Sequence, residues 1–242
     1  MTYQNFIYLE EDELDKPIYR IFPISRFIQI LTTNRLTLVK PKKWDDPFEN
    51  SLLSAVFTID GEKTEFSAKD EVYGQCWTQH RETDAMWRIY SPNKDGVRMK
   101  TTPRKLLNSL SSKTEKNPEV KCFIGKVKYK NKKNLEDCFS EIDLLNSNGS
   151  GIAASLLYKR KEFSHEKEVR LIYIGDSGKC DSDIFQYEIK PNELFERILF
   201  DPRMESSLRK SYISAIKCLG CNSEVRRSTL YDAPQLLEVN LN

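Results

Sequence analysis

The chain has 242 residues, of which 39% are hydrophobic and 31% are charged. This is enough apolar material for a full core, so we expect a single domain over residues 1–242, with its core between about 17 and 230. Because 38 Lys and Arg residues nearly cancel 36 Asp and Glu residues, the net charge of +2 predicts neither wrapping by nucleic acid nor adhesion to a membrane.

The N-terminal segment is acidic and polar, and no apolar run reaches the roughly 18 residues that a membrane span needs. We therefore expect a cytoplasmic protein without a membrane partner. Cys218 and Cys221 form a C-x-x-C pair, but there is no second pair and the two histidines lie far away in the sequence. A zinc site needs about four such ligands, so we expect no metal.

Hydrophobic periodicity predicts short strands interleaved with helices. In chain order these are a strand at 17–22, a helix from Ile24 to Leu31, strands at 36–39 and 72–78, a helix capped by Thr83 and running to Tyr90, a strand at 96–101, a helix over 103–110, a strand at 123–129, a helix at 135–145, strands at 168–174, 184–189 and 197–200, and a helix at 204–219. Few uninterrupted Val/Ile runs occur, which favours an α+β fold over a doubly wound parallel sheet.

An arginine interrupts the first apolar strand. Strand alternation places Arg20 on the same face as Ile18 and Phe22, with Tyr19 on the other face. An unpaired buried charge is costly, so Arg20 needs a partner. The pattern fits either a structural ion pair or an arginine that binds an anion such as a phosphate.

The loop over 40–50 carries Trp44 and Asp46. The proline at position 47 restrains Asp46 to an extended conformation, and aspartate side chains readily brace turns. The loop is therefore either structural or the frame of a pocket with Trp44 as a wall.

Two aromatic residues, Trp87 and Tyr90, lie three positions apart on a predicted helix and hence on one face. They either pack in the core or form a stacking platform for a flat heterocycle such as nicotinamide or adenine.

Two glutamates, Glu166 and Glu168, occur late in the chain and are followed by Arg170. In a strand these three side chains share one face, and the carboxylates, about 7 Å apart, repel each other unless a positive charge lies between or beside them. On a solvated edge this pattern is unremarkable. At the rim of a cleft the pair can act as a general base and as a group that stabilises a cation.

Basic residues gather in two places. Lys126, Lys128 and Lys130 alternate and would share a strand face, and a second basic run covers 159–161. Each run is either a docking surface for nucleic acid or a charged edge that blocks aggregation between sheets.

The order of these features resembles a bacterial family known as domain of unknown function 2971. The matching residues are Tyr19 with Arg20, the loop at 45–49, Trp87 to Tyr90 with Gly96, and Glu166 to Arg170. The sequence departs from the family pattern at Asp45, where the family has Asn. The name of that family supplies no function.

A second resemblance is to the ADP-ribosyltransferases. These enzymes carry an arginine or histidine on the first core strand, a Ser/Thr or Tyr element in the middle of the chain, and a late glutamate within E-x-E. Here Arg20, Thr78, Glu166 and Glu168 correspond, although Trp77-Thr78 departs from the usual Ser-Thr-Ser element. The resemblance implies two abutting, mostly antiparallel sheets around a cleft, with flanking helices.

The resemblance further implies NAD as substrate and no metal. Glu168 would stabilise the oxocarbenium-like ribose, and Glu166 would deprotonate the acceptor. The remaining expected contacts to NAD are Arg20 at the pyrophosphate or the adenosine ribose, Thr78 on the first strands of the cleft, Trp87 or Tyr90 beside nicotinamide, and Trp44 with Asp46 at the pocket wall. Arg20, Tyr90 and Glu168 should then converge on one cleft.

The main hypothesis is thus an NAD-dependent ADP-ribosyltransferase or NAD glycohydrolase, acting as a phage-defence or toxin-type effector on a protein or nucleic-acid acceptor. The alternative is a non-catalytic partner-binding or regulatory protein of a defence or toxin–antitoxin operon, with an operon-encoded protein partner. A metal-dependent nuclease is disfavoured, because Lys167 would point away from the two glutamates.

Overall fold

The computed structural model describes residues 5–59, 61–114, 121–144 and 146–234. Ten strands form the main sheet, in the order β1-β8-β11-β6-β2-β7-β13-β14, with β3 joined to β6 and β12 joined to β3. Their bounds are β1 Phe6–Ile7, β2 Ile18–Pro23, β3 Arg35–Val39, β6 Val72–Thr78, β7 Gly96–Thr101, β8 Cys122–Lys126, β11 Glu168–Ile174, β12 Ile184–Glu188, β13 Arg197–Phe200 and β14 Glu224–Arg226.

The main sheet is nearly divided in its middle. β2 pairs with β6 through a single register pair, Tyr19 with Thr78, whereas β6 pairs with β11 along its whole length. Within each half the pairing is antiparallel except for β1 with β8 and β13 with β14. The protein is therefore an α+β fold of mostly antiparallel strands, as predicted, and its two halves meet at one narrow junction.

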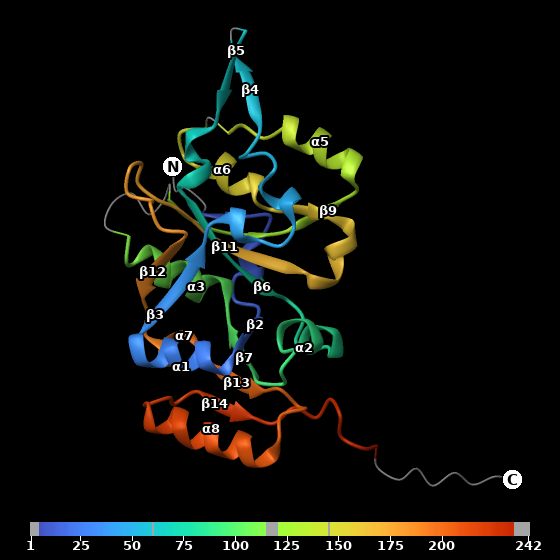
Figure 1. Ribbon diagram of the computed structural model, residues 1–242, viewed down its shortest axis with the longest axis vertical. Coiled ribbons are helices and arrows are strands. Elements are labelled where there is room, and N and C mark those ends of the chain that lie inside the picture. Colours follow the sequence, from blue (N-terminus) through green and yellow to red (C-terminus); the bar gives the residue numbers. More distant parts are fainter. Residues whose placement is uncertain (1–4, 60, 115–120, 145, 235–242) are drawn as a thin grey trace, which may run out of the picture.

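Helices and two small ribbons complete the fold. The helices are α1 Ile24–Thr33, α2 Asp84–Tyr90, α3 Pro103–Ser111, α5 Lys132–Ser140, α6 Ser150–Ser155, α7 Pro191–Leu194 and α8 Ser206–Cys218. The ribbons are β4 Val56–Ile59 with β5 Glu62–Glu65, and β9 Lys128–Lys130 with β10 Tyr158–Arg160. Figure 1 shows the β4–β5 ribbon at one end, α8 and β14 at the other, and α2 beside β6, β2 and β7.

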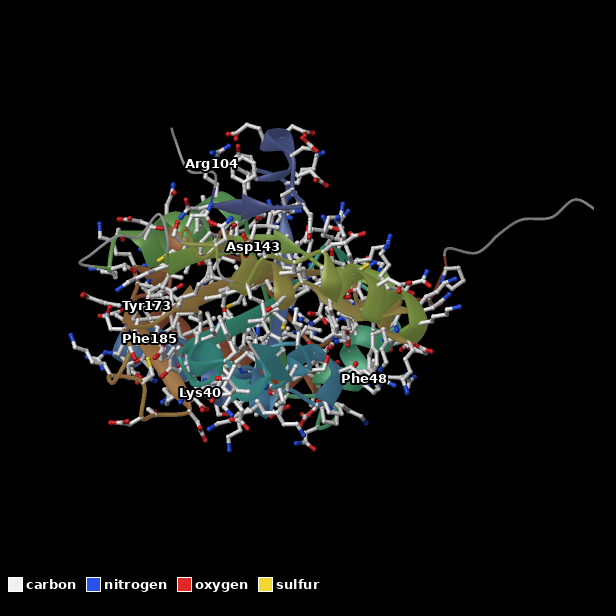
Figure 2. All side chains as sticks on the ribbon, turned by 90° about the horizontal axis from the view of Figure 1, so that it is seen from above. Lys40, Phe48, Arg104, Asp143, Tyr173 and Phe185 are labelled. Carbon is white, nitrogen blue, oxygen red and sulfur yellow. The ribbon has the colours of Figure 1, made fainter. Side chains whose placement is uncertain are left out.

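Strand β11 separates two cores, because its alternate side chains face in opposite directions. Val169, Leu171 and Tyr173 belong to the larger core, while Ile172 belongs to a smaller core beneath α6. At the end of the larger core, Tyr173 stacks on Phe185 with 4.1 Å between the ring centroids (Figure 2). Since both faces of β11 are covered, every residue along it is buried, the charged ones included.

Most predicted elements are present, with shifted ends. Thr83 caps α2 by accepting a hydrogen bond from the backbone N–H of Met86 at 3.2 Å, as expected. The strand predicted at 123–129 is broken, because the backbone N–H of Val127 bonds the carbonyl of Glu168 and the chain then continues as β9. The predicted helix at 135–145 instead begins at Lys132, and part of its predicted span, residue 145, lies outside the described residues.

Sequence patterning did not predict β1, the β4–β5 ribbon, β10 or β14. It also placed Glu166 in a strand, where the structure has a 3-10 helix, η5 Lys161–Glu166. Within the described ranges, no helix has the length and apolar character that crossing a membrane requires.

Candidate active site

A cavity of about 120 Å³ opens where the two halves of the sheet meet. Its walls come from β2, β6, β7, α2 and the segment that leads into β11. The residues that line it are Tyr19, Arg20, Ile21, Cys76, Trp77, Thr78, His80, Met86, Tyr90, Arg98, Glu166 and Glu168. The structure therefore brings Arg20, Thr78, Tyr90 and both predicted glutamates to one pocket.

The two glutamates reach the pocket from either side of a tight turn. Glu166 ends η5, Lys167 adopts a left-handed conformation with φ of 42°, and Glu168 begins β11. Both carboxylates contact the ammonium group of Lys159, which lies 2.6 Å from Oε1 of Glu168. Lys159 is the positive charge that a pair of neighbouring carboxylates requires.

A second ionic layer lies behind Glu168. The side chain of Arg170 is 0% exposed, and its Nε donates to Oε2 of Glu168 at 2.7 Å. Its other two nitrogens donate to the carbonyl of Leu156, at 2.6 Å, and to the carboxylate of Glu49. All three guanidinium nitrogens are thus paired, which is the condition for keeping an arginine in a core.

The indole of Trp44 covers this layer, with the Arg170 guanidinium 4.5 Å from its ring. The indole can lie this close because β6 has a glycine below it. A Cβ on Gly74 would come within 2.6 Å of the indole carbons. Trp44 therefore shields the ionic layer from solvent and does not line the pocket.

The buried charges do not balance. Among the described residues, Glu49, Glu166 and Glu168 form ion pairs with two cations, Lys159 and Arg170. Burial by itself would raise the pKa of Glu168, but the charges of Arg170 and Lys159 outweigh it and hold that pKa well below its usual range. Burial and the neighbouring charge of Glu168 raise the pKa of Glu166 to about 7. One carboxylate is fixed in its ionised form, and the other titrates near neutral pH.

Tyr90 and Thr78 fix the position of Glu166. The hydroxyl of Tyr90 donates to Oε1 of Glu166 at 2.9 Å, and burial raises the pKa of Tyr90, which therefore stays protonated. Thr78 donates through Oγ1 to the backbone carbonyl of Glu166 at 2.6 Å and accepts from the backbone N–H of His80. The carboxylate of Glu166 thus has two donors, Tyr90 and Lys159, and its backbone carbonyl is held by Thr78.

Arg20 has no partner of this kind. Its guanidinium lies 4.8 Å from the ring centroid of Phe22, on the face predicted from strand alternation. The Nη1 of Arg20 is buried and donates no hydrogen bond to any described residue, and burial lowers the pKa of Arg20. Among the described residues Arg20 forms no ion pair, and it lines the pocket. This favours the interpretation of Arg20 as an anion-binding residue over that of a structural ion pair.

Three residues expected at the pocket lie elsewhere. Trp87 is fully buried in α2, where its indole N–H donates to Glu82 at 2.8 Å. Asp46 caps the short helix η3 Pro47–Asn50 by accepting from the N–H of Phe48, and it pairs with Arg160. Trp44 covers the ionic layer as described above. The polar groups of Trp87 and Asp46 are already bonded to neighbours, and the ring of Trp44 lies against Arg170.

The structure does not expose the two basic runs as the continuous surfaces that the sequence pattern predicted. Lys159 is buried in the ionic network and is not available for docking. Lys126 pairs with Glu13, and the Nζ of Lys128 lies 3.4 Å from the ring centroid of Tyr8. The break between β8 and β9 disrupts the single alternating face that the pattern predicted.

Sequence reasoning missed three residues of the site. The sequence pattern places Lys159 among its basic neighbours and gives Glu49 only as the last residue of the loop at 45–49. Arg98 gave no signal other than being an arginine in an apolar strand, the same signal that pointed to Arg20. Among the described residues, no three His, Cys, Asp or Glu side chains are grouped so that they could hold a metal ion.

Comparison with known families gives one match. The family model described as "Protein of unknown function (DUF2971)" matches residues 86–171, a segment that includes most of α2 together with Glu166 and Glu168. The family resemblance drawn from the sequence is confirmed over that segment. No curated protein matches the chain.

Among solved structures, the chain is similar to DarT from Thermus sp. 2.9. The complex with ADP-ribosylated ssDNA is 13% identical, with 92% of this chain and 96% of that chain covered and a TM-score of 0.42. The complex with NAD+ is 11% identical, with 91% and 97% covered and a TM-score of 0.41. The complex with carba-NAD+ is 11% identical, with 90% and 96% covered and a TM-score of 0.40.

Proposed function

We propose that the protein cleaves the bond between nicotinamide and ribose in NAD and transfers ADP-ribose to an acceptor or to water. The observation that carries this proposal is the charge arrangement of the pocket. A carboxylate held in its ionised form, Glu168, lines the same cavity as Arg20, whose buried Nη1 has no acceptor among the described residues. NAD offers the complementary charges, a cationic nicotinamide riboside and an anionic pyrophosphate.

Glu168 acts on the ribose. As the bond from C1′ to the nicotinamide nitrogen breaks, its electron pair leaves with nicotinamide and positive charge develops on the ribose. An ionised carboxylate stabilises this charge more in the transition state than in the bound substrate, which lowers the barrier. The two carboxylate oxygens of Glu168 already accept hydrogen bonds from Lys159 and Arg170, but each keeps a lone pair for a ribose hydroxyl.

Glu166 acts on the acceptor. The lone pair of an acceptor hydroxyl, or of water, forms the new bond to C1′, and the proton of that acceptor moves to Glu166. A general base works best with a pKa near the working pH, and the pKa of about 7 of this carboxyl meets that requirement. Tyr90, which is 40% exposed, orients the base at the mouth of the pocket.

Arg20 binds the other part of the substrate. Its planar guanidinium carries donors in the fork geometry that suits phosphate oxygens, and no described residue occupies them. Thr78 acts as a positioning residue for Glu166. A role as an effector in phage defence or as a toxin, and the choice between a protein and a nucleic-acid acceptor, stay predictions.

The proposal is tested by incubating the protein with NAD, labelled in the adenosine part, and measuring nicotinamide release and label transfer to a bacterial lysate. We expect Glu168→Gln to abolish both reactions and Arg20→Met to raise the KM for NAD. Glu162→Gln is the matched control, because Glu162 lies in the same short helix η5 but is exposed.

The non-catalytic alternative makes the opposite prediction. A partner-binding protein would release no nicotinamide and would show no heat of binding with NAD in a calorimetric titration. Activity that survives Glu168→Gln in folded protein would remove Glu168 from the reaction. Because replacing Glu168 leaves buried cations unpaired, the thermal unfolding midpoint of each variant is measured alongside.

A further inference from the structure

A second arginine in the pocket has no partner. Arg98 lies in β7, opposite Ile21 of β2, and is 7% exposed. Its guanidinium lies 4.7 Å from the ring centroid of Tyr19, and both residues line the cavity. Its Nε and Nη1 atoms are buried, and neither donates a hydrogen bond to any group in the described part of the chain.

The other buried arginine of this protein shows how unusual that is. All three guanidinium nitrogens of Arg170 are paired. Arg203, which is partly buried, donates to the carboxylate of Asp201 and to two backbone carbonyls of α2 and its end. A buried donor without an acceptor loses its hydrogen bonds to water and gains none in return.

The nearest carboxylate does not relieve Arg98. Glu82 interacts with it electrostatically, but no ion pair forms, and Oε1 of Glu82 accepts from the indole of Trp87 and from the hydroxyl of Ser228. Burial lowers the pKa of Arg98 and outweighs the opposing effect of the Glu82 charge. Arg98 thus lines the cavity, and its two buried donors have no acceptor among the described residues.

Arg20 and Arg98 flank the edge of β2. In the β2–β7 ladder Arg20 is opposite Met99 and Arg98 is opposite Ile21, so the two side chains leave opposite faces of the sheet. They line one cavity because β2 ends its pairing with β6 after a single residue pair, and the cavity opens along that free edge. A ligand with two adjoining anionic groups can reach both arginines there.

We propose that Arg98, held against the ring of Tyr19, is a second anion-binding residue of this pocket and takes a phosphate of a diphosphate ligand. In the NAD reaction proposed above, on which this assignment of the ligand rests, Arg20 and Arg98 divide the pyrophosphate between them. The planar guanidinium of Arg98 presents its two buried donors to the phosphate oxygens. Tyr19 keeps that plane in place by stacking.

The test measures binding by calorimetry with three probes: inorganic pyrophosphate, ADP-ribose and nicotinamide. We expect Arg98→Met to weaken pyrophosphate and ADP-ribose by roughly 10- to 100-fold and to leave nicotinamide unchanged. Arg98→Lys keeps the charge but lacks the fork, so it should recover only part of the loss. Arg104→Met is the control, because Arg104 is exposed and paired with Asp15 and Glu11 outside the cavity (Figure 2).

The outcomes separate this inference from the proposed function. If the parent binds pyrophosphate but not NAD, and Arg98→Met loses pyrophosphate, Arg98 is an anion site and the NAD reaction is wrong. If Arg98→Met binds pyrophosphate and ADP-ribose as the parent does, or if the parent binds neither, the role of Arg98 is overturned. If Arg98 had a purely structural role, Arg98→Met would have a lower thermal unfolding midpoint than the parent in the absence of ligand. We expect the midpoint of Arg98→Met not to fall.

Discussion

The ammonium nitrogen of Lys159 lies 2.6 Å from Oε1 of Glu168, although the two residues come from different sheets. Lys159 belongs to the β9–β10 ribbon and Glu168 to the main sheet. Each side chain is 7% exposed, so neither charge is hydrated to an extent that would support it alone. The contact keeps the proposed catalytic carboxylate ionised and also joins the ribbon to the sheet.

Replacing Lys159 should cost stability and activity together. Lys159→Met leaves three carboxylates with Arg170 as their only close cation in the network. Removing one partner of a buried pair costs about 3–5 kcal/mol, which we expect as the loss in the free energy of unfolding in urea. Adding Glu49→Gln should recover part of that loss, because it removes one unpaired charge. A double variant no more stable than Lys159→Met would contradict this coupling.

The rate should depend on the ionisation of Glu166. Burial and the charge of Glu168 raise the pKa of Glu166 to about 7, and only the deprotonated form accepts a proton from the acceptor. We therefore expect kcat/KM for NAD cleavage to rise with pH and to level off above about 8, about one unit above that pKa. Glu166→Gln should remove this rise and leave a slow, flat profile. If Glu166→Gln still shows a rise in kcat/KM with the same pKa, that rise belongs to another group.

Stability should follow the opposite trend. The folded protein holds the proton of Glu166 more tightly than the unfolded chain, because the pKa rises from 4.5 to about 7 on folding. The stabilisation from this proton is complete below pH 4.5 and is lost as the pH rises through 7. The gain in rate with pH thus cannot be attributed to a more stable fold.

Tyr90→Phe should move the pH profile without unfolding the protein. The Tyr90 hydroxyl donates to Oε1 of Glu166 at 2.9 Å, and a donor to a carboxylate favours its charged form. Without that donor the pKa of Glu166 rises further, so the kinetic limb should shift to higher pH by up to about one unit. Profiles of parent and variant between pH 5.5 and 9 measure this. A shift to lower pH would mean that Tyr90 does not donate to Glu166.

Thr78 should affect turnover more than substrate binding. Thr78→Val removes the donor to the carbonyl of Glu166 and leaves that buried oxygen unpaired, at a cost of about 1–3 kcal/mol in stability. The displaced Glu166 should lower kcat, while the KM for NAD changes little. Thr78→Ser keeps the hydroxyl and should restore kcat. If Ser fails to restore it, the methyl group and not the hydrogen bond is what matters at this position.

Local patterns were enough to predict the elements that carry the pocket. The alternation in β11 and the Thr83 cap of α2 depend on residues within a few positions, and both are present. Arg20, Thr78, Tyr90 and Glu168 could be placed for the same reason, since each belongs to a short strand or helix with a clear period, whereas Glu166 ends a 3-10 helix that the pattern did not predict. The side chains then meet because β2, β6 and β11 lie next to each other in the sheet.

The charge network could not be predicted in this way. Glu49 and Arg170 are 121 positions apart, and nothing within the loop of Glu49 shows that it will be covered. Lys159 has the local signature of a solvated basic run, and its charge is buried by η3 and η5, which pack against β10 and supply Glu49 and Glu166. Arg98 could have been found by the reasoning used for Arg20, since each is an arginine between apolar strand residues.

Trp87 and Tyr90 lie close together in α2 but have different roles, Trp87 in the core and Tyr90 in the pocket. The sequence placed Trp87 and Tyr90 on one helical face, yet Trp87 is fully buried and bonded to Glu82, while Tyr90 lines the cavity. We expect Trp87→Phe to lower the free energy of unfolding by about 1–3 kcal/mol, from the lost hydrogen bond and the space left by the smaller ring.

The same variant should bind NAD with the affinity of the parent, because the indole does not reach the cavity. Urea unfolding and calorimetric titration with NAD, made on one preparation, measure both quantities. Tyr90→Phe, which lines the cavity, is the paired comparison. A Trp87→Phe protein of unchanged stability that binds NAD several-fold more weakly would place the indole against the ligand. It would then restore the stacking role that its helical spacing first suggested.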